Sequence, residues 1–171
     1  MRSLIDYLDA PGIKEDGKSF SENALKKARF YSALFKTLTI ADDSGLEVDA
    51  LGGRPGIYSA RYAGERATDR KNKQRLLAQM KRVPASKRGA QFVCSLAVVS
   101  AEGKEAVVEG MCRGWIGFKE MGKKGFGYDA LFVLPRSGKT MAQLALKEKD
   151  RISHRGKALR RFRKVVNDFM S

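Results

Sequence analysis

Two amphipathic helical segments, separated by short apolar strands, constrain the fold of this chain most. Residues 20–35 carry apolar side chains at helical spacing, and Ser19 precedes them with Glu22 three positions on, the pattern that caps a helix start. Residues 154–170 carry a second apolar stripe opposite a row of lysines and arginines, with Ser153 as the expected cap. Helices mixed with strands in this way favour an α/β fold built on one sheet system.

Short runs of apolar and β-branched residues between these helices predict the strands. Residues 37–41 and 46–50 form two runs, and we expect the sequence Asp42-Asp43-Ser44-Gly45 between them to be a turn. Residues 91–99 and 105–112 predict a hairpin around Ala101-Glu102-Gly103, and a further short strand is expected at 130–134. Between the runs at 46–50 and 91–99, a helix is predicted to follow a cap at Thr68 and to end before Pro84.

Length and charge narrow the functional classes. The 171 residues suit one domain, residues 1–171, and no apolar stretch approaches the roughly 20 residues of a membrane span. Acidic residues close to the N-terminus argue against a secretory signal, so we expect a soluble protein of the cytoplasm. The net charge of +15 indicates either an anionic partner or a strongly charged, solvated surface. Nucleic acid, nucleotides and acidic membranes all fit as the partner.

Adjacent carboxylates at Asp42 and Asp43 are the clearest candidate for chemistry. A divalent cation is one reason to keep two such charges together, because magnesium prefers oxygen ligands, usually one or two carboxylates and substrate phosphates. A turn that uses aspartate for local hydrogen bonds is the alternative. Glu15, just before the first helix, could add a carboxylate or serve the helix dipole.

Two further groups of polar residues allow both a functional and a structural interpretation. Lys27, one turn into the first helix, could face phosphates or lie in solvent. His154, the only histidine, begins the last helix beside Arg155. Helix starts attract anions and polar edges of bases, but a histidine there could equally serve as a cap.

Five segments occur in one order along nearly the whole chain and together are specific. They are SFSENA (19–24), ADDSGL (41–46), LGGRPGIYSARY (51–62), GFGYD (125–129) and ISHRGKAL (152–159). In this combination the sequence resembles the inosine triphosphate pyrophosphatase family, also called HAM1-like or non-standard purine triphosphatases.

The resemblance implies an α/β fold with a mixed, twisted sheet flanked by helices. That family begins with a strand, a phosphate-binding turn of the form Ser/Thr-Gly-Asn-x-x-Lys and a helix, and no such turn occurs in this sequence. We therefore expect the first strand and most of the first helix to be missing, with residues 1–8 as the end of that helix. Ala130 is a smaller departure, since the family usually has proline there.

The resemblance also implies roles for individual residues. Asp43 would be the catalytic carboxylate that activates water at a bound Mg²⁺, with Glu15 and Asp42 as further metal-site residues. The residues expected to bind the substrate are Lys27, Ser44, Phe126, Gly127, Tyr128, Asp129, Lys149, His154 and Arg155. Among these, Phe126 would stack on the purine, while Arg155, Lys149 and a protonated His154 would donate to the carbonyl that inosine and xanthosine carry in place of adenine's amino group.

The implied function is hydrolysis of non-standard purine triphosphates (ITP, dITP or XTP) to the monophosphate and pyrophosphate by a homodimer, which would cleanse the nucleotide pool. A shortened, inactive relative that binds nucleotide or a partner subunit is the alternative. A nucleic-acid-binding protein is a third hypothesis, motivated by the basic face of the last helix. Since that helix lacks a recognised DNA-reading context, we do not expect nucleic acid as the main partner. We expect no membrane partner either.

Overall fold

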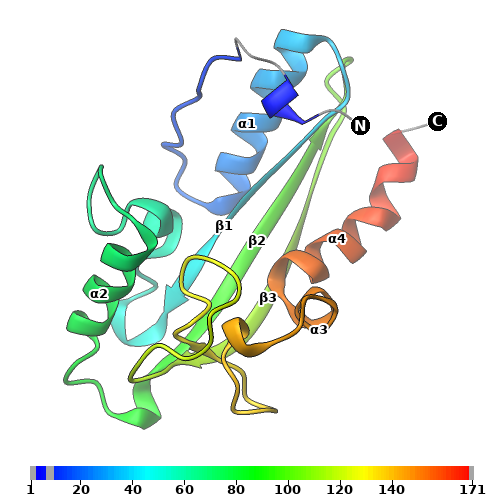
Figure 1. Cartoon of the computed structure of the whole chain (residues 1–171). Helices are drawn as coiled ribbons and strands as arrows, with labels where there is room; N and C mark the ends of the chain where they lie inside the picture. The colour runs from blue at the N-terminus through cyan, green and yellow to red at the C-terminus, as the bar shows by residue number, and fades with distance from the viewer. Residues whose placement is uncertain (1–2, 7–9, 170–171) are drawn as a thin grey trace.

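A four-stranded antiparallel sheet lies at the centre of the molecule in the computed structural model, which describes residues 3–6 and 10–169. Neighbouring strands follow the chain order, so the sheet is a meander (Figure 1). The strands are β1 (Thr39–Val48), β2 (Gly89–Val99), β3 (Glu105–Ile116) and β4 (Phe132–Val133). The expected α/β sheet flanked by helices is confirmed, and every strand pair within the described residues is antiparallel.

Within residues 3–6 and 10–169, four α-helices flank or border this sheet. They are α1 (Phe20–Phe35), α2 (Asp69–Gln79), α3 (Leu146–Ile152) and α4 (His154–Val165). Short 3-10 turns connect the elements at Leu4–Asp6, Asp49–Leu51, Gly56–Arg61, Ala85–Lys87, Met141–Gln143 and Val166–Phe169. Within the described residues, the helices are all too short or too polar to cross a lipid bilayer.

The predicted caps of the two long helices are confirmed. The Ser19 hydroxyl accepts a hydrogen bond from the Glu22 amide, although the Glu22 carboxylate reaches back to the Lys18 amide and not to that of Ser19. The Ser153 hydroxyl accepts from the Gly156 amide and caps α4. The last helix ends earlier than predicted, since its α-helical part stops at Val165 and a 3-10 turn follows; position 170 lies outside the described residues.

The predicted turn at residues 42–45 is wrong. The structure has one continuous strand there, and every residue of β1 from Thr39 to Val48 is in register with β2. Antiparallel pairing over ten residues satisfies the backbone, which a local preference of aspartate for turns does not outweigh. As a result Asp42 and Asp43 lie within a strand, where successive side chains point to opposite faces.

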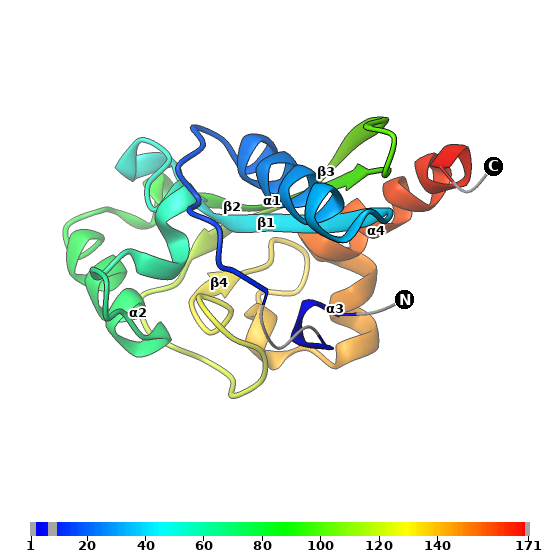
Figure 2. The same cartoon turned by 90° about the horizontal axis from the view of Figure 1, so that it is seen from above.

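The two faces of the sheet pack against different helices. On one face Ala97 and Val99 of β2 contact α1, and on the other Leu96 and Val98 contact α4. Figure 2 shows α1 above the sheet and α3 below it. In register with β2, Asp43 lies beside Ser95 and therefore shares the α1 face, whereas Asp42 lies beside Leu96 and shares the α4 face.

The largest apolar cluster fixes the end of the sheet that borders the candidate site. Leu46 and Phe92 pack there with Leu76 of α2 and Phe132 of β4. The fully buried guanidinium of Arg88 donates to backbone carbonyls of residues 80, 83, 116 and 117, which ties the end of α2 to the end of β3. The loops that follow β3 are thereby anchored beneath the sheet.

The start of α4 lies directly against the backbone of β3 at Gly110. A β-carbon at this position would lie 2.2 Å from the carbonyl oxygen of His154 and 2.3 Å from the amide nitrogen of Ala158. Only glycine allows this approach, and the approach fixes where His154 and Arg155 enter the site.

Candidate functional site

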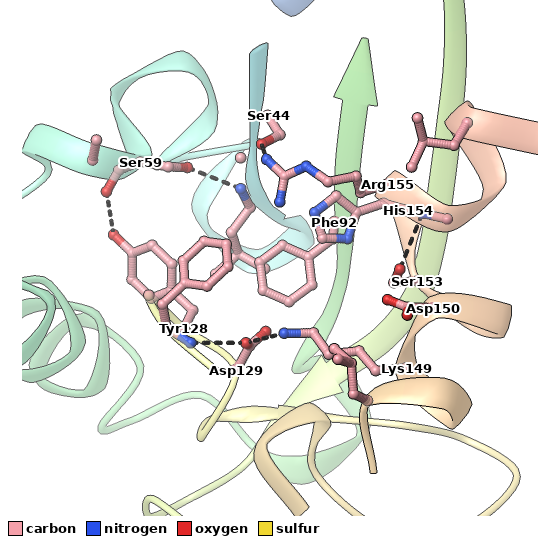
Figure 3. Close-up of a pocket in the computed structure, with 18 of the residues that line it drawn as sticks. Ser44, Ser59, Phe92, Tyr128, Asp129, Lys149, Asp150, Ser153, His154 and Arg155 are labelled. Carbon is pink, nitrogen blue, oxygen red and sulfur yellow. Dashed lines mark hydrogen bonds and ion pairs between the residues drawn. The ribbon is translucent and has the colours of Figure 1, made fainter. Parts of the chain in front are cut away.

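A cavity of about 560 Å³ opens between β1, the start of α4 and the loop at residues 126–129 (Figure 3). Its walls bring together most of the residues expected to bind a nucleoside. They are Ser44, Phe126, Gly127, Tyr128, Asp129, Lys149, His154 and Arg155. A volume of this size is in the range of pockets for nucleotide-sized ligands.

Phe126 lies at the cavity with two cations near its ring. The residue is 65% exposed, and its ring centroid lies 5.2 Å from the Lys149 ammonium and 5.9 Å from the Arg155 guanidinium carbon. An exposed aromatic ring of this kind offers a face on which a planar base can stack. The two cations place hydrogen-bond donors beside the same space.

Asp129 organises the loop that carries Phe126. Its carboxylate accepts from the Phe126 amide at 3.0 Å and from the Lys149 ammonium at 2.5 Å, while the Gly127 amide donates to Asp69. Gly125 has a φ of +79°, and a β-carbon there would lie 2.0 Å from the Asp129 carboxylate. Glycine at this position therefore allows both the turn and the close packing of the carboxylate.

Tyr128 and His154 form the inner part of the cavity. Tyr128 is buried, and burial raises the pKa of its phenol. The hydroxyl donates to the Ser59 carbonyl at 2.9 Å. The His154 ring is 8% exposed and stacks on Phe92 with centroids 4.8 Å apart. Its Nδ1 atom is buried and has no hydrogen-bond partner among the residues that the structure describes, so a polar group of a ligand could satisfy it.

The protonation of His154 differs from the sequence-based expectation. Burial, together with the positive charges of Arg155 and Lys149, lowers the pKa of His154 to about 3. At neutral pH the imidazole is therefore uncharged and carries one N–H donor, with one nitrogen left as an acceptor. The surroundings in the free protein therefore disfavour a protonated His154 as a donor to the base, because two cations lie beside a buried ring.

Arg155 links the cavity to the edge strand β1. Its Nη2 atom donates to the Asp42 carboxylate at 2.6 Å and to the Ser44 hydroxyl at 3.1 Å. Burial opposes the charged form of this guanidinium, but the bond and charge of Asp42 outweigh it, and the pKa of Arg155 is raised overall. The cation is thus held against two residues on one face of β1.

The opposite face of β1 carries a second cluster, formed by Glu15, Lys27 and Asp43. The Lys27 ammonium lies 2.7 Å from a Glu15 carboxylate oxygen and 3.5 Å from an Asp43 carboxylate oxygen. The other Asp43 oxygen accepts from the buried Asn23 amide at 3.1 Å. Burial raises the pKa of Asp43, and the opposing effects of Lys27 and Asn23 only partly offset this shift.

Asp42 does not join this carboxylate cluster. The sequence grouped it with Glu15 and Asp43 as a metal-site residue, but its side chain points to the α4 face and pairs with Arg155. Among residues 3–6 and 10–169, no three His, Cys, Asp or Glu side chains gather as a metal centre. Glu15 and Asp43 still fit a magnesium ion, because they already hold one cation between them and Mg²⁺ often takes only one or two protein carboxylates.

The two clusters approach each other around the edge of the sheet. A second cavity, of about 880 Å³, runs along β1 beside α1 and includes both Lys27 and Asp42 in its wall. Because Asp42 pairs with Arg155, one ion pair joins the wall of the second cavity to the wall of the first. In the described part of the chain no other strand covers this side of β1.

A sequence model of the Ham1 family matches residues 1–165. The chain belongs to the Ham1 family. Two relatives with the name dITP/XTP pyrophosphatase are similar to it. The protein of Geobacillus kaustophilus is 53% identical over 159 residues, which are 93% of this chain and 78% of that protein. The protein of Shouchella clausii is 47% identical over 167 residues, which are 97% of this chain and 84% of that protein.

Solved structures of the family share the fold. A Staphylococcus aureus Ham1 protein superposes with a TM-score of 0.90 at 39% identity and covers 96% of this chain and 85% of its own. A nucleoside-triphosphatase / dITP/XTP pyrophosphatase of Mycobacterium abscessus has a TM-score of 0.81 at 45% identity, over 94% and 82% of the two chains.

Sequence reasoning missed several residues of this Ham1-family site. Asn23 positions Asp43, Phe92 supports His154, and the Ser59 carbonyl holds Tyr128. Asn23 lies within the SFSENA segment (19–24), and that motif could have marked it as a site residue. Phe92 lies in an apolar run like any other core residue, so no local signal distinguishes it.

Proposed function

We propose that this protein hydrolyses non-standard purine nucleoside triphosphates, namely dITP, ITP and XTP, to the monophosphate and pyrophosphate. The observation that carries the proposal is the pairing of a base-sized cavity with a cluster of Glu15, Lys27 and Asp43 across one strand edge, in a chain of the Ham1 family. The names of the relatives from Geobacillus kaustophilus and Shouchella clausii support the same reaction.

The purine occupies the cavity at Phe126 in this proposal. Its base stacks on the exposed Phe126 ring, and the cations of Lys149 and Arg155 donate to the carbonyl of hypoxanthine or xanthine. Adenine presents an amino group in the same place. This amino group and the cationic side chains are all donors, so the buried polar groups would be left unpaired. The uncharged His154 accepts or donates one hydrogen bond beside them.

The triphosphate extends around the edge of β1 toward α1. Lys27 lies in the wall of the cavity on that side, and its ammonium suits a phosphate oxygen. When the phosphates take this charge, the Glu15 and Asp43 carboxylates are released from the lysine. The same movement leaves both carboxylates available to a cation.

Asp43 acts as the general base. A water molecule attacks the α-phosphorus, its oxygen forms the new P–O bond, and the bond to the bridging oxygen breaks so that pyrophosphate leaves. The proton from the water passes to the Asp43 carboxylate, whose pKa is raised by burial and is therefore better matched to this task than that of an exposed aspartate. Asn23 keeps the carboxylate oriented through its amide.

Glu15 and Asp43 would hold Mg²⁺ when it is bound. Such an ion supplies charge neutralisation for the phosphate oxygens and a lowered pKa for the attacking water. Asp42 is not part of this pair in the proposal, because its carboxylate is engaged by Arg155 on the other face.

Release of pyrophosphate from dITP, XTP, ITP and ATP tests the proposal. We expect turnover of the three non-standard purine triphosphates with Mg²⁺, a fall of about a hundredfold or more for Asp43→Asn, and little turnover of ATP. Equal rates for ATP and dITP would refute the roles given to Lys149 and Arg155. Release of inorganic phosphate without pyrophosphate would refute attack at the α-phosphorus.

We further propose that the protein acts as a homodimer in the cytoplasm, as the family resemblance implies. Sedimentation equilibrium of the purified chain measures the oligomeric state, and a concentration-independent monomer mass would contradict the dimer. Fractionation of the source cells tests the location.

A further inference from the structure

We infer that Asp42 is a positioning residue for base recognition, which it performs through Arg155, and is not a ligand of the catalytic metal. The inference rests on the proposed function and assigns to the second carboxylate of the Asp42-Asp43 pair a task different from that of the first. The two carboxylates lie on opposite faces of β1, with Asp43 toward α1 and Asp42 toward α4.

The contacts of Arg155 show how it is positioned. One nitrogen, Nη2, donates to both Asp42 and Ser44, which are two residues apart and therefore on the same face of the strand. Arg155 itself stands at the start of α4, where Gly110 fixes the helix against β3. The Arg155 side chain is thus fixed at its backbone end by α4 and at its guanidinium end by β1.

The anchoring matters because a free arginine side chain is costly to order. An unrestrained arginine loses rotamer entropy when a ligand fixes it, and Asp42 removes part of that cost in advance. The side chains of Asp42 and Arg155 are each 39% exposed, so the pair contributes little to the stability of the fold. Its main effect is on the direction in which Arg155 presents its remaining donors.

Asp42 also balances the charge of the cavity. Lys149 is already paired with Asp129, and among the described residues Arg155 forms its ion pair with Asp42, so loss of this carboxylate would leave the cation without an ion-pair partner. An uncompensated cation attracts any anion, including the phosphates of ATP, whereas a paired one discriminates by geometry. The loss of Asp42 should therefore weaken selectivity between dITP and ATP as well as affinity for dITP.

The test is the substitution Asp42→Asn in the full chain, with kinetics on dITP and ATP. We expect KM for dITP to rise roughly ten- to hundredfold, the effect of losing one charge-assisted hydrogen bond. We expect kcat to stay within about threefold and the Mg²⁺ concentration for half-maximal rate to stay unchanged, because transition-state chemistry and the metal lie on the other face. Asp42→Glu should bring the KM for dITP part of the way back to the wild-type value.

Two controls separate this role from a structural one. Asp49→Asn removes an aspartate–arginine pair of the same 2.6 Å length, with Arg113, and should leave KM and kcat unchanged. In a double-mutant cycle, Asp42→Asn should add little to the effect of Arg155→Met on KM, because both remove one interaction. A fall in kcat together with a raised Mg²⁺ requirement would overturn the inference and make Asp42 a metal-site residue. Additive effects with Arg155→Met would also overturn it.

Binding of inosine monophosphate in the absence of metal, followed by calorimetry, distinguishes this inference from the proposed function. If the wild-type chain binds this nucleotide but releases no pyrophosphate from dITP, the proposed reaction fails. In that case weaker binding by Asp42→Asn still supports the positioning role, and equal binding refutes it. Failure of the wild-type chain to bind any purine nucleotide would overturn both.

Discussion

The buried imidazole of His154 predicts that this protein loses stability as the pH falls below 6.5. In the folded chain, burial and the charges of Arg155 and Lys149 lower the pKa of His154 from 6.5 to about 3. Between these two values the unfolded chain binds a proton that the folded chain does not. Acid therefore favours unfolding through this window, and the contribution is complete once the pH falls below about 3.

The magnitude follows from the two pKa values. A pH of 5 lies 1.5 units below the imidazole pKa of 6.5 in the unfolded chain, so that ring is protonated, while the folded ring is still neutral. One unit corresponds to about 1.4 kcal/mol, so the free energy of unfolding should be about 2 kcal/mol lower at pH 5 than at pH 8 from this residue alone. Because His154 is the only histidine, no other imidazole adds to the difference.

Urea unfolding of the wild type and of His154→Phe at pH 8 and pH 5 measures this effect. Phenylalanine keeps the stack on Phe92 and cannot titrate, so the variant should lack the extra 2 kcal/mol or so of acid destabilisation. Asp43 has a raised pKa and so favours the folded chain in mild acid, but it does so in both chains. The difference between the two chains therefore isolates His154.

An equal loss of stability in both chains would refute this reasoning. The single histidine also gives one set of imidazole signals in an NMR titration, which needs no variant. A midpoint near 6.5 in the folded protein would show that the ring is accessible to water, and the assignment of a neutral His154 to the base pocket would fail with it.

Three further substitutions test other parts of the structure. Asn23→Ala removes the amide that lowers the pKa of Asp43, so the acid limb of the pH profile of kcat/KM should move to higher pH; an unchanged limb would contradict the contact. Gly110→Ala should lower the urea midpoint by the equivalent of about 1–3 kcal/mol, since its β-carbon meets backbone atoms of α4, and a neutral effect would show that α4 can shift. Arg88→Met leaves several buried carbonyls unpaired and should cost at least about 3 kcal/mol in thermal unfolding, whereas a loss below about 1 kcal/mol would mean that water replaces the guanidinium.

Local sequence signals were sufficient for much of the fold. The caps at Ser19 and Ser153 depend on hydrogen bonds within three residues of each helix start, so the sequence there contains the whole interaction. The hairpin of β2 and β3 follows from two apolar runs and a short polar connection, which is again a local pattern. The family motifs also predicted the candidate site residues, and most of those expected to bind a nucleoside line one cavity.

The same local reasoning failed at residues 42–45. Aspartate, serine and glycine favour turns, but pairing with β2 along the whole of β1 outweighs that preference. The sequence also could not show that Asn23 and Phe92 support Asp43 and His154, because these contacts join elements far apart in the chain.

What the sequence by itself determined is the family to which the chain belongs and most of its helices and strands, since motifs and caps depend on neighbours along the chain. What only the tertiary structure decided is which partners two adjacent carboxylates meet and how the surroundings shift the pKa of His154. Asp43 meets Lys27 and Asp42 meets Arg155 because a strand alternates its side chains between two faces that different helices cover. The pKa of His154 depends on burial and on charges from other parts of the fold, which exist only once the chain has packed.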